Sequence, residues 1–267
     1  YSHDQDKEYE VIITLGATSD TDDITGKISK LEPSKKEEIT KQKIKKTLKK
    51  FIGTIKQVPP IYSAIKIKGE RSYKLARQGS DHSMPTKTIT IHAIKLKNYK
   101  YPDISLQIIC STGTYIRSLA RDIGSALNTG AYVKQLNRSR IGLYKIENSI
   151  KLNELTAINT KKHLIPTKTL VSHLPSINLT DDNVAQFYKG QAIGNREVKQ
   201  QLSNPLKIAK KNALNEQKGF IAIFNSHNAL LGIGYYDYST HLLHPKKVLP
   251  PPLKKLRCTA PTDISSF

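Results

Sequence analysis

The chain has 267 residues, which is enough for a sizeable core and more typical of two domains than of one. Its 43 lysines and arginines outnumber 22 acidic residues and give a net charge of +21, which points to a polyanionic partner, with nucleic acid ahead of an anionic membrane. No apolar run has membrane-spanning length, and tryptophan, the usual anchor of surface-lying helices, is absent. Cys110 and Cys258 match neither a disulfide framework nor a zinc site, so we expect a cytoplasmic protein.

The only methionine is Met84, so the chain does not begin at an initiator methionine. Either processing removed an upstream segment, or the sequence is part of a longer reading frame. Nothing else in the composition is typical of an extracellular protein, so we favour a missing upstream segment.

The first element predicted is a strand over residues 9–15, where apolar side chains alternate up to Gly16. Tyr9 lies on its apolar face, as expected of a core aromatic whose hydroxyl reaches a partner. Residues 17–26, ATSDTDDITG, are dense in Asp, Ser, Thr and Gly and predict a turn-forming loop. Its aspartates lack the pattern of a calcium loop, which favours a structural role.

Residues 34–53 predict a surface helix with one apolar side, and its lysines are either a solvated face or phosphate contacts. Pro59 and Pro60 then force an extended chain. The following elements are a short strand over 62–67, a turn around Gly69, a two-turn helix over 72–78 that Gly79 stops, and a bulged strand over 86–98.

Residues 110–124, CSTGTYIRSLARDIG, predict a strand end, a turn at Gly113 and a helix with Thr114 as its N-cap. Arg117 then lies in the first helical turn, where a cation is unusual because that end carries partial positive charge. An anion close by would explain it: an RNA phosphate, or a carboxylate from another part of the chain. The alternative is a solvated arginine whose stem covers apolar surface.

Residues 130–142, GAYVKQLNRSRIG, carry Arg138 and Arg140, donors suited to a phosphate backbone; a charged surface strand or loop explains them equally. Farther on, the pattern predicts a strand, a helix with its N-cap signal at Thr180, and a hairpin around 225–228. The predicted organisation is a first domain over 1–150, a linker over 151–174, a small mainly β domain over 175–250 and a disordered tail over 251–267.

Four stretches in this order resemble the TruB-type tRNA pseudouridine synthases. KEYEVIITLGATSDTDDITG is similar to that family's K-x-Y strand and LGxxTDTxDxxG loop, and QVPPIYSAIKIKGERSYKLARQG to its QxPPxYSAxKxxGxxxYxxAR-x-G block. CSTGTYIRSLARDIG resembles the GTYIRxLxxDxG block, and GAYVKQLNRSRIG the GAxxxxLxRxxxG block. The resemblance covers residues 7 to about 142, and NLTDDNVAQFYKGQAI is similar to the start of the PUA-like domain of bacterial members.

The resemblance implies an α+β fold with a long, mostly antiparallel sheet, followed by a small PUA-like, RNA-binding β domain. It also implies isomerisation of the T-loop uridine of tRNA, position 55 by tRNA convention: the glycosidic bond breaks, the uracil rotates and it rejoins through C5. No metal or organic cofactor is implied, and the partner is the T arm of tRNA, bound by a monomer. The target base must be flipped out of a folded RNA loop.

The resemblance assigns catalytic roles to Tyr9, which would stack on the flipped base and help remove its C5 proton, and to Arg117, which would pair with the catalytic aspartate. The residues implied in substrate binding are Tyr115, Leu136, Lys66, Arg138 and Arg140. The family's nucleophilic Asp lies in a GTLDPxAxG-like block upstream of the K-x-Y strand, and no part of this sequence matches that block. We therefore expect the nucleophile in the absent upstream segment.

Two other functions stay open on the sequence. The first is a shorter product that binds or folds tRNA without modifying it. The second is a secreted basic protein, which would need an upstream apolar segment.

Overall fold

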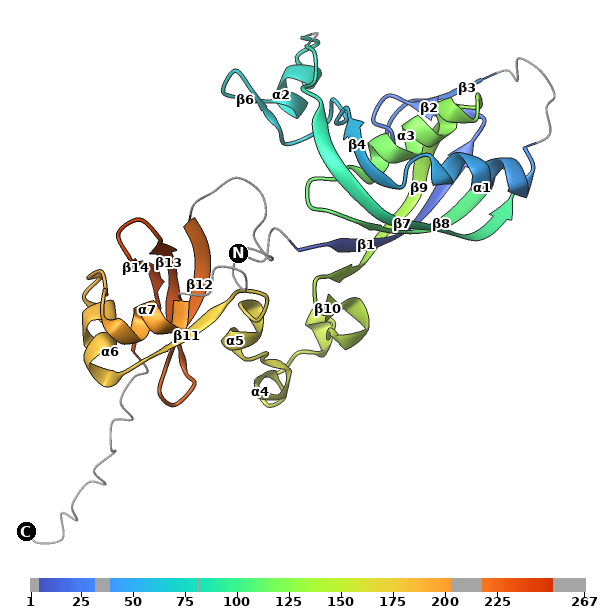
Figure 1. Ribbon diagram of the computed structural model, residues 1–267. Coiled ribbons are helices and arrows are strands. Elements are labelled where there is room, and N and C mark those ends of the chain that lie inside the picture. Colours follow the sequence, from blue (N-terminus) through green and yellow to red (C-terminus); the bar gives the residue numbers. More distant parts are fainter. Residues whose placement is uncertain (1–4, 32–38, 81, 203–217, 252–267) are drawn as a thin grey trace, which may run out of the picture. The chain divides into compact units, whose positions relative to one another are not determined.

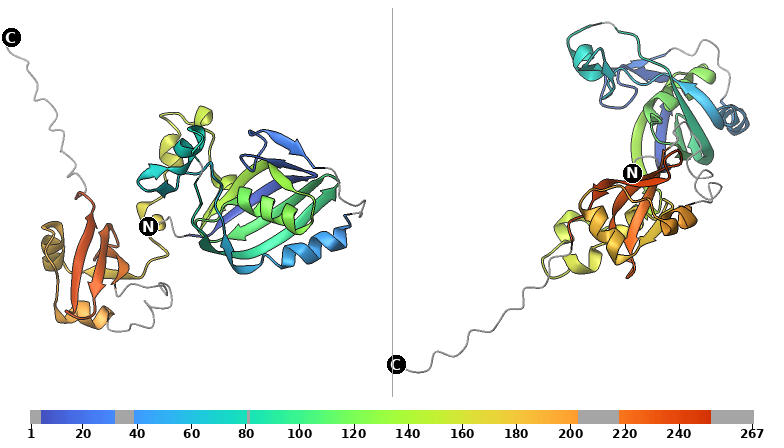
Figure 2. Two further views of the ribbon diagram at one scale, coloured as in Figure 1. Left: turned by 90° about the horizontal axis from the view of Figure 1, so that it is seen from above. Right: turned by 60° about the vertical axis from the view of Figure 1, so that its left-hand side comes forward.

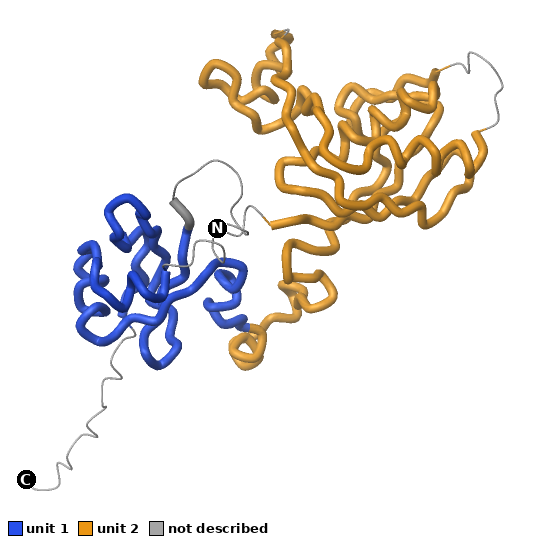
Figure 3. Tube along the Cα trace, viewed as in Figure 1, with its two compact units in different colours: residues 1, 164–267 blue, residues 2–163 orange. Residues whose placement is uncertain are grey.

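The computed structural model describes residues 5–31, 39–80, 82–202 and 218–251. The chain divides into two compact units, which we call the N-terminal unit, residues 2–163, and the C-terminal unit, from residue 164 onward (Figure 3). The division falls inside the stretch 151–174 that the sequence predicts as a linker.

A six-stranded sheet organises the N-terminal unit (Figure 1). Its strand order is β10-β9-β1-β8-β7-β4, and every neighbouring pair is antiparallel, which confirms the expected α+β fold with a long antiparallel sheet. Residues 131–141, which the sequence left as a strand or a loop, pair with β1. The strands are β1 (Lys7–Leu15), β4 (Gly53–Gln57), β7 (Lys87–Lys100), β8 (Asp103–Cys110), β9 (Ala131–Ile141) and β10 (Tyr144–Lys145).

Helices α1 (Lys41–Lys49) and α3 (Ile116–Ala126) cover one face of this sheet (Figure 2). Alternate residues of the central strands point toward the helices and form one buried apolar cluster with them, as a two-residue strand period requires. Gly124 lets α3 approach β9, because a Cβ there would collide with the backbone nitrogen of Ala131. The side chains at the centre of this core include Val11, Ile13, Ile44, Leu48, Leu106, Ile108, Leu119 and Ile123.

Several predicted element boundaries are wrong, beginning with those of α1 and of the stretch 17–26. Helix α1 ends at Lys49 rather than residue 53, and begins after Thr40, whose side chain accepts a hydrogen bond from the Lys43 N–H; residues 34–38 of the predicted helix lie outside the described residues. The stretch 17–26 is not wholly a loop, because strand β2 (Ala17–Ser19) pairs with β3 (Ile28–Lys30).

The segment after β4 carries smaller elements: β5 (Lys66–Ile67), β6 (Glu70–Arg71) and helix α2 (Ser72–Arg77). The strand predicted over 62–67 is shorter than expected, since only its last two residues pair with β6. Short 3₁₀ turns at Ile146–Asn148 and Leu152–Glu154 and helix α4 (Thr160–His163) follow β10.

A four-stranded sheet in the order β11-β12-β13-β14 forms the C-terminal unit, with only β11 and β12 parallel. Helices α6 and α7 pack on one face through Phe187, Val198 and Leu202, while Val171 and Leu174 cover the other. Within the described parts of both units, no helix is long and apolar enough to cross a membrane. The predicted tail lies outside the described residues, apart from Pro251. The elements are α5 (Thr167–Leu170), β11 (Ser176–Leu179), α6 (Asp181–Tyr188), α7 (Arg196–Leu202), β12 (Lys218–Asn225), β13 (Leu230–Asp237) and β14 (Leu242–Val248).

Candidate functional site

Helix α3 begins one residue later than the sequence predicts. Its N-cap is Tyr115, in extended conformation, and not Thr114. The Thr114 hydroxyl instead donates to the carbonyl of Ser111 at 2.9 Å, which closes the turn where Gly113 adopts a φ of +80°. Arg117 nevertheless lies in the first helical turn, as expected.

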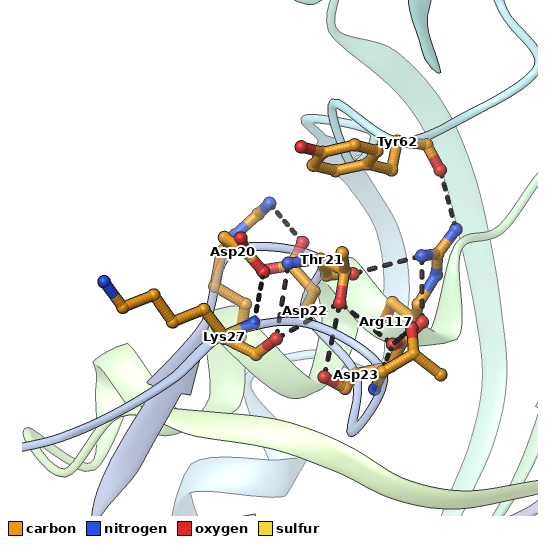
Figure 4. A network of polar contacts seen from close by, with 10 residues as sticks. Asp20, Thr21, Asp22, Asp23, Lys27, Tyr62 and Arg117 are labelled. Carbon is orange, nitrogen blue, oxygen red and sulfur yellow. Dashed lines mark hydrogen bonds and ion pairs between the residues drawn. The ribbon is translucent and has the colours of Figure 1, made fainter. Parts of the chain in front are cut away.

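Arg117 is held by three oxygen acceptors (Figure 4). Its Nη1 donates to the carbonyl of Thr21 and to Oδ2 of Asp23, both at 3.0 Å, and its Nη2 donates to the carbonyl of Tyr62 at 2.9 Å. The anion expected beside this cation is therefore a carboxylate from another part of the chain. Asp23 comes from the stretch 17–26, whose aspartates we expect to have a structural role.

Asp23 is itself fixed by the loop that carries it. Its Oδ1 accepts from the Thr21 hydroxyl and from the backbone N–H of Thr25, both at 2.9 Å. Partial burial opposes ionisation, but the hydrogen bonds from Thr25 and Thr21 and the charge of Arg117 outweigh it and lower the pKa of the Asp23 carboxyl. Asp23 is thus a carboxylate at neutral pH, and its oxygens are already occupied.

Arg121, one turn farther along α3, makes a parallel set of contacts. It pairs with Asp22 at 2.9 Å and with Asp122 at 3.1 Å, and its Nη2 donates to the carbonyl of Val58 at 2.9 Å. Burial raises the pKa of Asp22 although the Arg121 charge acts in the opposite direction. Arg117 and Arg121 of α3 therefore form ion pairs with the consecutive aspartates Asp23 and Asp22 of one loop. Among the described residues, no cluster has the composition of a metal site.

A pocket of about 500 Å³ opens beside Arg117. Of the predicted site residues, it contains Tyr115 and Arg117. The segment from the end of β4 through α2 supplies most of the remainder, including Tyr73 and Arg77 of α2. The Arg77 guanidinium lies 5.7 Å from the centre of the Tyr73 ring. The complete lining is Thr21, Thr25, Tyr62, Ser63, Ala64, Tyr73, Arg77, Tyr115 and Arg117.

The sequence did not single out as site residues Thr21, Thr25 or five lining residues of the later stretch: Tyr62, Ser63, Ala64, Tyr73 and Arg77. The five later residues lie within the stretch 57–79, which resembles a family block, and the two threonines lie in the stretch that resembles the family's loop.

The other predicted site residues lie outside this pocket lining. Tyr9 is on β1 opposite Arg138 of β9, with which it shares a hydrogen bond, and burial raises the pKa of its phenol. Arg140 donates from Nε to Oε2 of Glu8 at 2.9 Å, so it is an ion-pair partner within the sheet. Leu136 on β9 and Lys66 on β5 are exposed.

Two family profiles match the chain in tandem. The TruB family pseudouridylate synthase N-terminal domain matches residues 1–116, and the tRNA pseudouridylate synthase B C-terminal domain matches residues 117–176. Among solved structures, a chain of a Cbf5–Nop10–Gar1 complex has a TM-score of 0.64 at 21% identity, over 93% of this chain and 68% of that one. This likeness shows a shared fold.

Curated relatives extend the match. The tRNA pseudouridine synthase B of Prochlorococcus marinus is 38% identical over 91% of this chain and 77% of its own length. The protein of the same name from Synechocystis is 36% identical over 70% of this chain, which spans 64% of that relative. With the pocket, the antiparallel sheet and these matches together, the chain belongs to the TruB family of pseudouridylate synthases.

Proposed function

We propose that this chain, completed by an upstream block that carries the nucleophile, performs the tRNA pseudouridine(55) synthase reaction, the isomerisation of the T-loop uridine of tRNA. The observation that carries the proposal is the position of Arg117: a family-matched arginine is held rigidly on the wall of a pocket that three tyrosines also line. Tyrosine rings offer stacking surfaces to a flipped base, and the +21 charge of the chain favours an RNA partner.

The remaining site residues keep the roles that the family resemblance implies. Tyr9 is a neutral phenol at physiological pH, and burial raises its pKa further. It stacks on the base and relays the C5 proton, its own hydroxyl proton passing to water as the C5 proton arrives. Arg138 and Lys66 contact RNA, as does the C-terminal unit, and Leu136 with Tyr115 lines the base site. Arg140 contributes chiefly by holding Glu8.

The nucleophilic carboxylate is not Asp23 in this proposal. Asp23 lies in the stretch that resembles the family's TDTxD loop and not its nucleophile block, and its carboxylate is held by Arg117, Thr21 and Thr25 as a counter-charge. The described residues that line the pocket include no carboxylate. The expectation that a GTLDP-like block supplies the nucleophile stays a prediction.

Tyr9→Phe, made in the protein extended to its natural start codon, tests the proton transfer. The variant keeps a ring that can stack on the base but loses the hydroxyl. We therefore expect the rate of pseudouridine formation to fall sharply while tRNA affinity changes only modestly. Filter binding and turnover assays on the same preparation separate the two. Tyr101→Phe, at an exposed position, is the control; a fully active Tyr9→Phe protein removes the hydroxyl from the mechanism.

Tritium release tests the reaction itself. Isomerisation replaces the C5–H bond of uridine by a C5–C1′ bond, so a tRNA transcript labelled at uridine C5 releases tritium to water. A transcript with cytidine at position 55 is the control, and the chain is compared with a version extended to its natural start codon. Release only from the extended protein supports the proposal and places the nucleophile upstream. Tight tRNA binding without release from either favours a protein that binds tRNA without modifying it.

A further inference from the structure

Gln57 is the last residue of the edge strand β4, and its side chain reaches the start of the helix that carries Arg117. The residue is 1% exposed. Its Nε2 donates to the carbonyl of Tyr115 at 3.1 Å, and its Oε1 accepts from the backbone N–H of Tyr115 at 2.8 Å. One side-chain amide therefore pairs with both backbone groups of a residue that is distant in sequence.

A glutamine is the side chain that this contact requires. The Tyr115 N–H needs an acceptor and its carbonyl needs a donor, and the two must lie on one planar group. Asparagine is shorter, an ionised glutamate lacks the donor, and methionine has neither group. Tyr115 is an N-cap residue whose own side chain forms no cap hydrogen bond, so Gln57 satisfies an N–H that the helix leaves unpaired.

The amide belongs to a row of contacts that fasten residues 57–62 to α3. The carbonyls of Val58 and Tyr62 accept from Arg121 and Arg117, both at 2.9 Å. These two contacts join the carbonyls to side chains of α3. Gln57 instead bonds to the backbone of the N-cap residue, so of the three contacts it acts most directly on the start of α3.

We infer that Gln57 is a positioning residue for pseudouridine formation: it fixes the start of α3, and thereby the places of the Tyr115 ring and the Arg117 guanidinium on the pocket wall. The inference rests on the proposed function. It adds a group that touches no substrate and acts entirely through the backbone of Tyr115. Displacement of reacting groups by about 1 Å can lower a rate about 100-fold, while the charges that attract RNA are untouched.

Gln57→Met in the full-length protein is the test, because methionine fills the same space without either hydrogen bond. With enzyme in saturating excess over tRNA, the single-turnover rate constant reports geometry and is independent of the fraction of folded enzyme. We expect this rate constant to fall about 10- to 100-fold with the tRNA Kd unchanged within about threefold. We also expect the Tyr115 amide to exchange with deuterium faster in the RNA-free variant.

The control is Asn183→Leu, which removes a buried amide of the C-terminal unit with comparable hydrogen bonds. It should lower the melting temperature and leave the rate constant unchanged. A wild-type rate constant in Gln57→Met overturns the inference, as does unchanged exchange at Tyr115. A wild-type protein that releases no tritium would overturn the proposed function instead, and the exchange measurement would still decide whether Gln57 fixes the helix start.

Discussion

At the scale of single residues, the site depends on arginines whose charges are already paired. Arg117 and Asp23 are both only partly exposed, at 26% and 21% of the side chain, so their attraction is screened less than that of a surface pair. Because Asp23 is also bonded by its own loop, it acts as a fixed counter-charge. The guanidinium therefore reaches the pocket with little freedom to turn.

Asp23→Asn should weaken this arrangement without removing the arginine. The amide keeps its shape but loses the charge, so Arg117 gains freedom and we expect turnover to fall about 100-fold with little change in tRNA affinity. Single-turnover kinetics and binding measure the two effects. Asp20→Asn, an exposed position in the same loop whose Oδ1 accepts from the Lys27 N–H, is the matched control. Equal rates for both variants would remove Asp23 from the positioning of Arg117.

The carboxyl group of Glu8 makes the stability of the N-terminal unit depend on pH. Its hydrogen bonds with Arg140 and Gln107 and the Arg140 charge lower its pKa below the usual 4.5, against the effect of burial. A carboxyl whose pKa is lower when folded stabilises the protein above its unfolded pKa, and this stabilisation disappears as pH falls through the folded pKa.

Glu8→Gln should therefore lower the free energy of unfolding at pH 7 by about 1.5–3 kcal/mol. The difference from wild type should shrink as pH falls from about 5 toward 3. Urea titrations across this range measure it. Glu10→Gln, exposed on the same strand, should match wild type throughout; a constant Glu8→Gln difference at every pH would contradict the ion-pair account.

At the scale of elements, α1 shows how one helix serves two purposes. Ile44 and Leu48 are buried in the core, while Lys41, Lys45, Lys46, Lys49 and Lys50 are exposed. The helix has no acidic residue in its first turn, and Lys46 and Lys49 lie in its last turn, where the helix dipole favours cations. The lysine face is thus available to phosphates.

Replacing Lys45, Lys46 and Lys49 by glutamine should weaken tRNA binding and reduce the slope of log K against log salt. The reduction should be about 0.7–0.9 for each phosphate that the helix no longer neutralises. The single-turnover rate at saturating enzyme should not change. Binding measured from about 50 to 200 mM salt tests this. An unchanged slope would mean that the lysines of α1 contact solvent and not RNA phosphates, which is the other interpretation of this stretch of sequence.

The start of α3 and the stretch 17–26 show where the local sequence pattern predicted the wrong structure. Thr114 is a good N-cap by type, but its hydroxyl closes the preceding turn and Tyr115 takes the cap position. The polar stretch 17–26 contains a strand because residues 28–30 come back to pair with it. In both cases a contact that the local residue preferences do not encode determined the boundary.

At the scale of the whole molecule, the chain contains two units with separate buried clusters. Truncating Phe187, which is 0% exposed in the C-terminal cluster, to alanine should cost about 3–5 kcal/mol in that unit alone. Hydrogen exchange resolved by segment should show faster opening in residues 176–248 and unchanged protection in β1 and β8. Uniform loss of protection would mean that the units unfold together.

The amino-acid sequence was sufficient to predict the strands and helices with clear periodicity and the family blocks. The roles that these blocks assign to Tyr9 and Arg117 stay predictions. These features are local: alternation, helical spacing and motif order are present in the chain before it folds. The folded structure was needed to identify Asp23 as the partner of Arg117, which is 94 residues away in the sequence. It was also needed to show that Gln57 forms hydrogen bonds with Tyr115, which is 58 residues away. Hydrogen bonds and ion pairs of this kind need atoms about 3 Å apart, and that proximity arises only when the sheet has formed and α3 has packed against it.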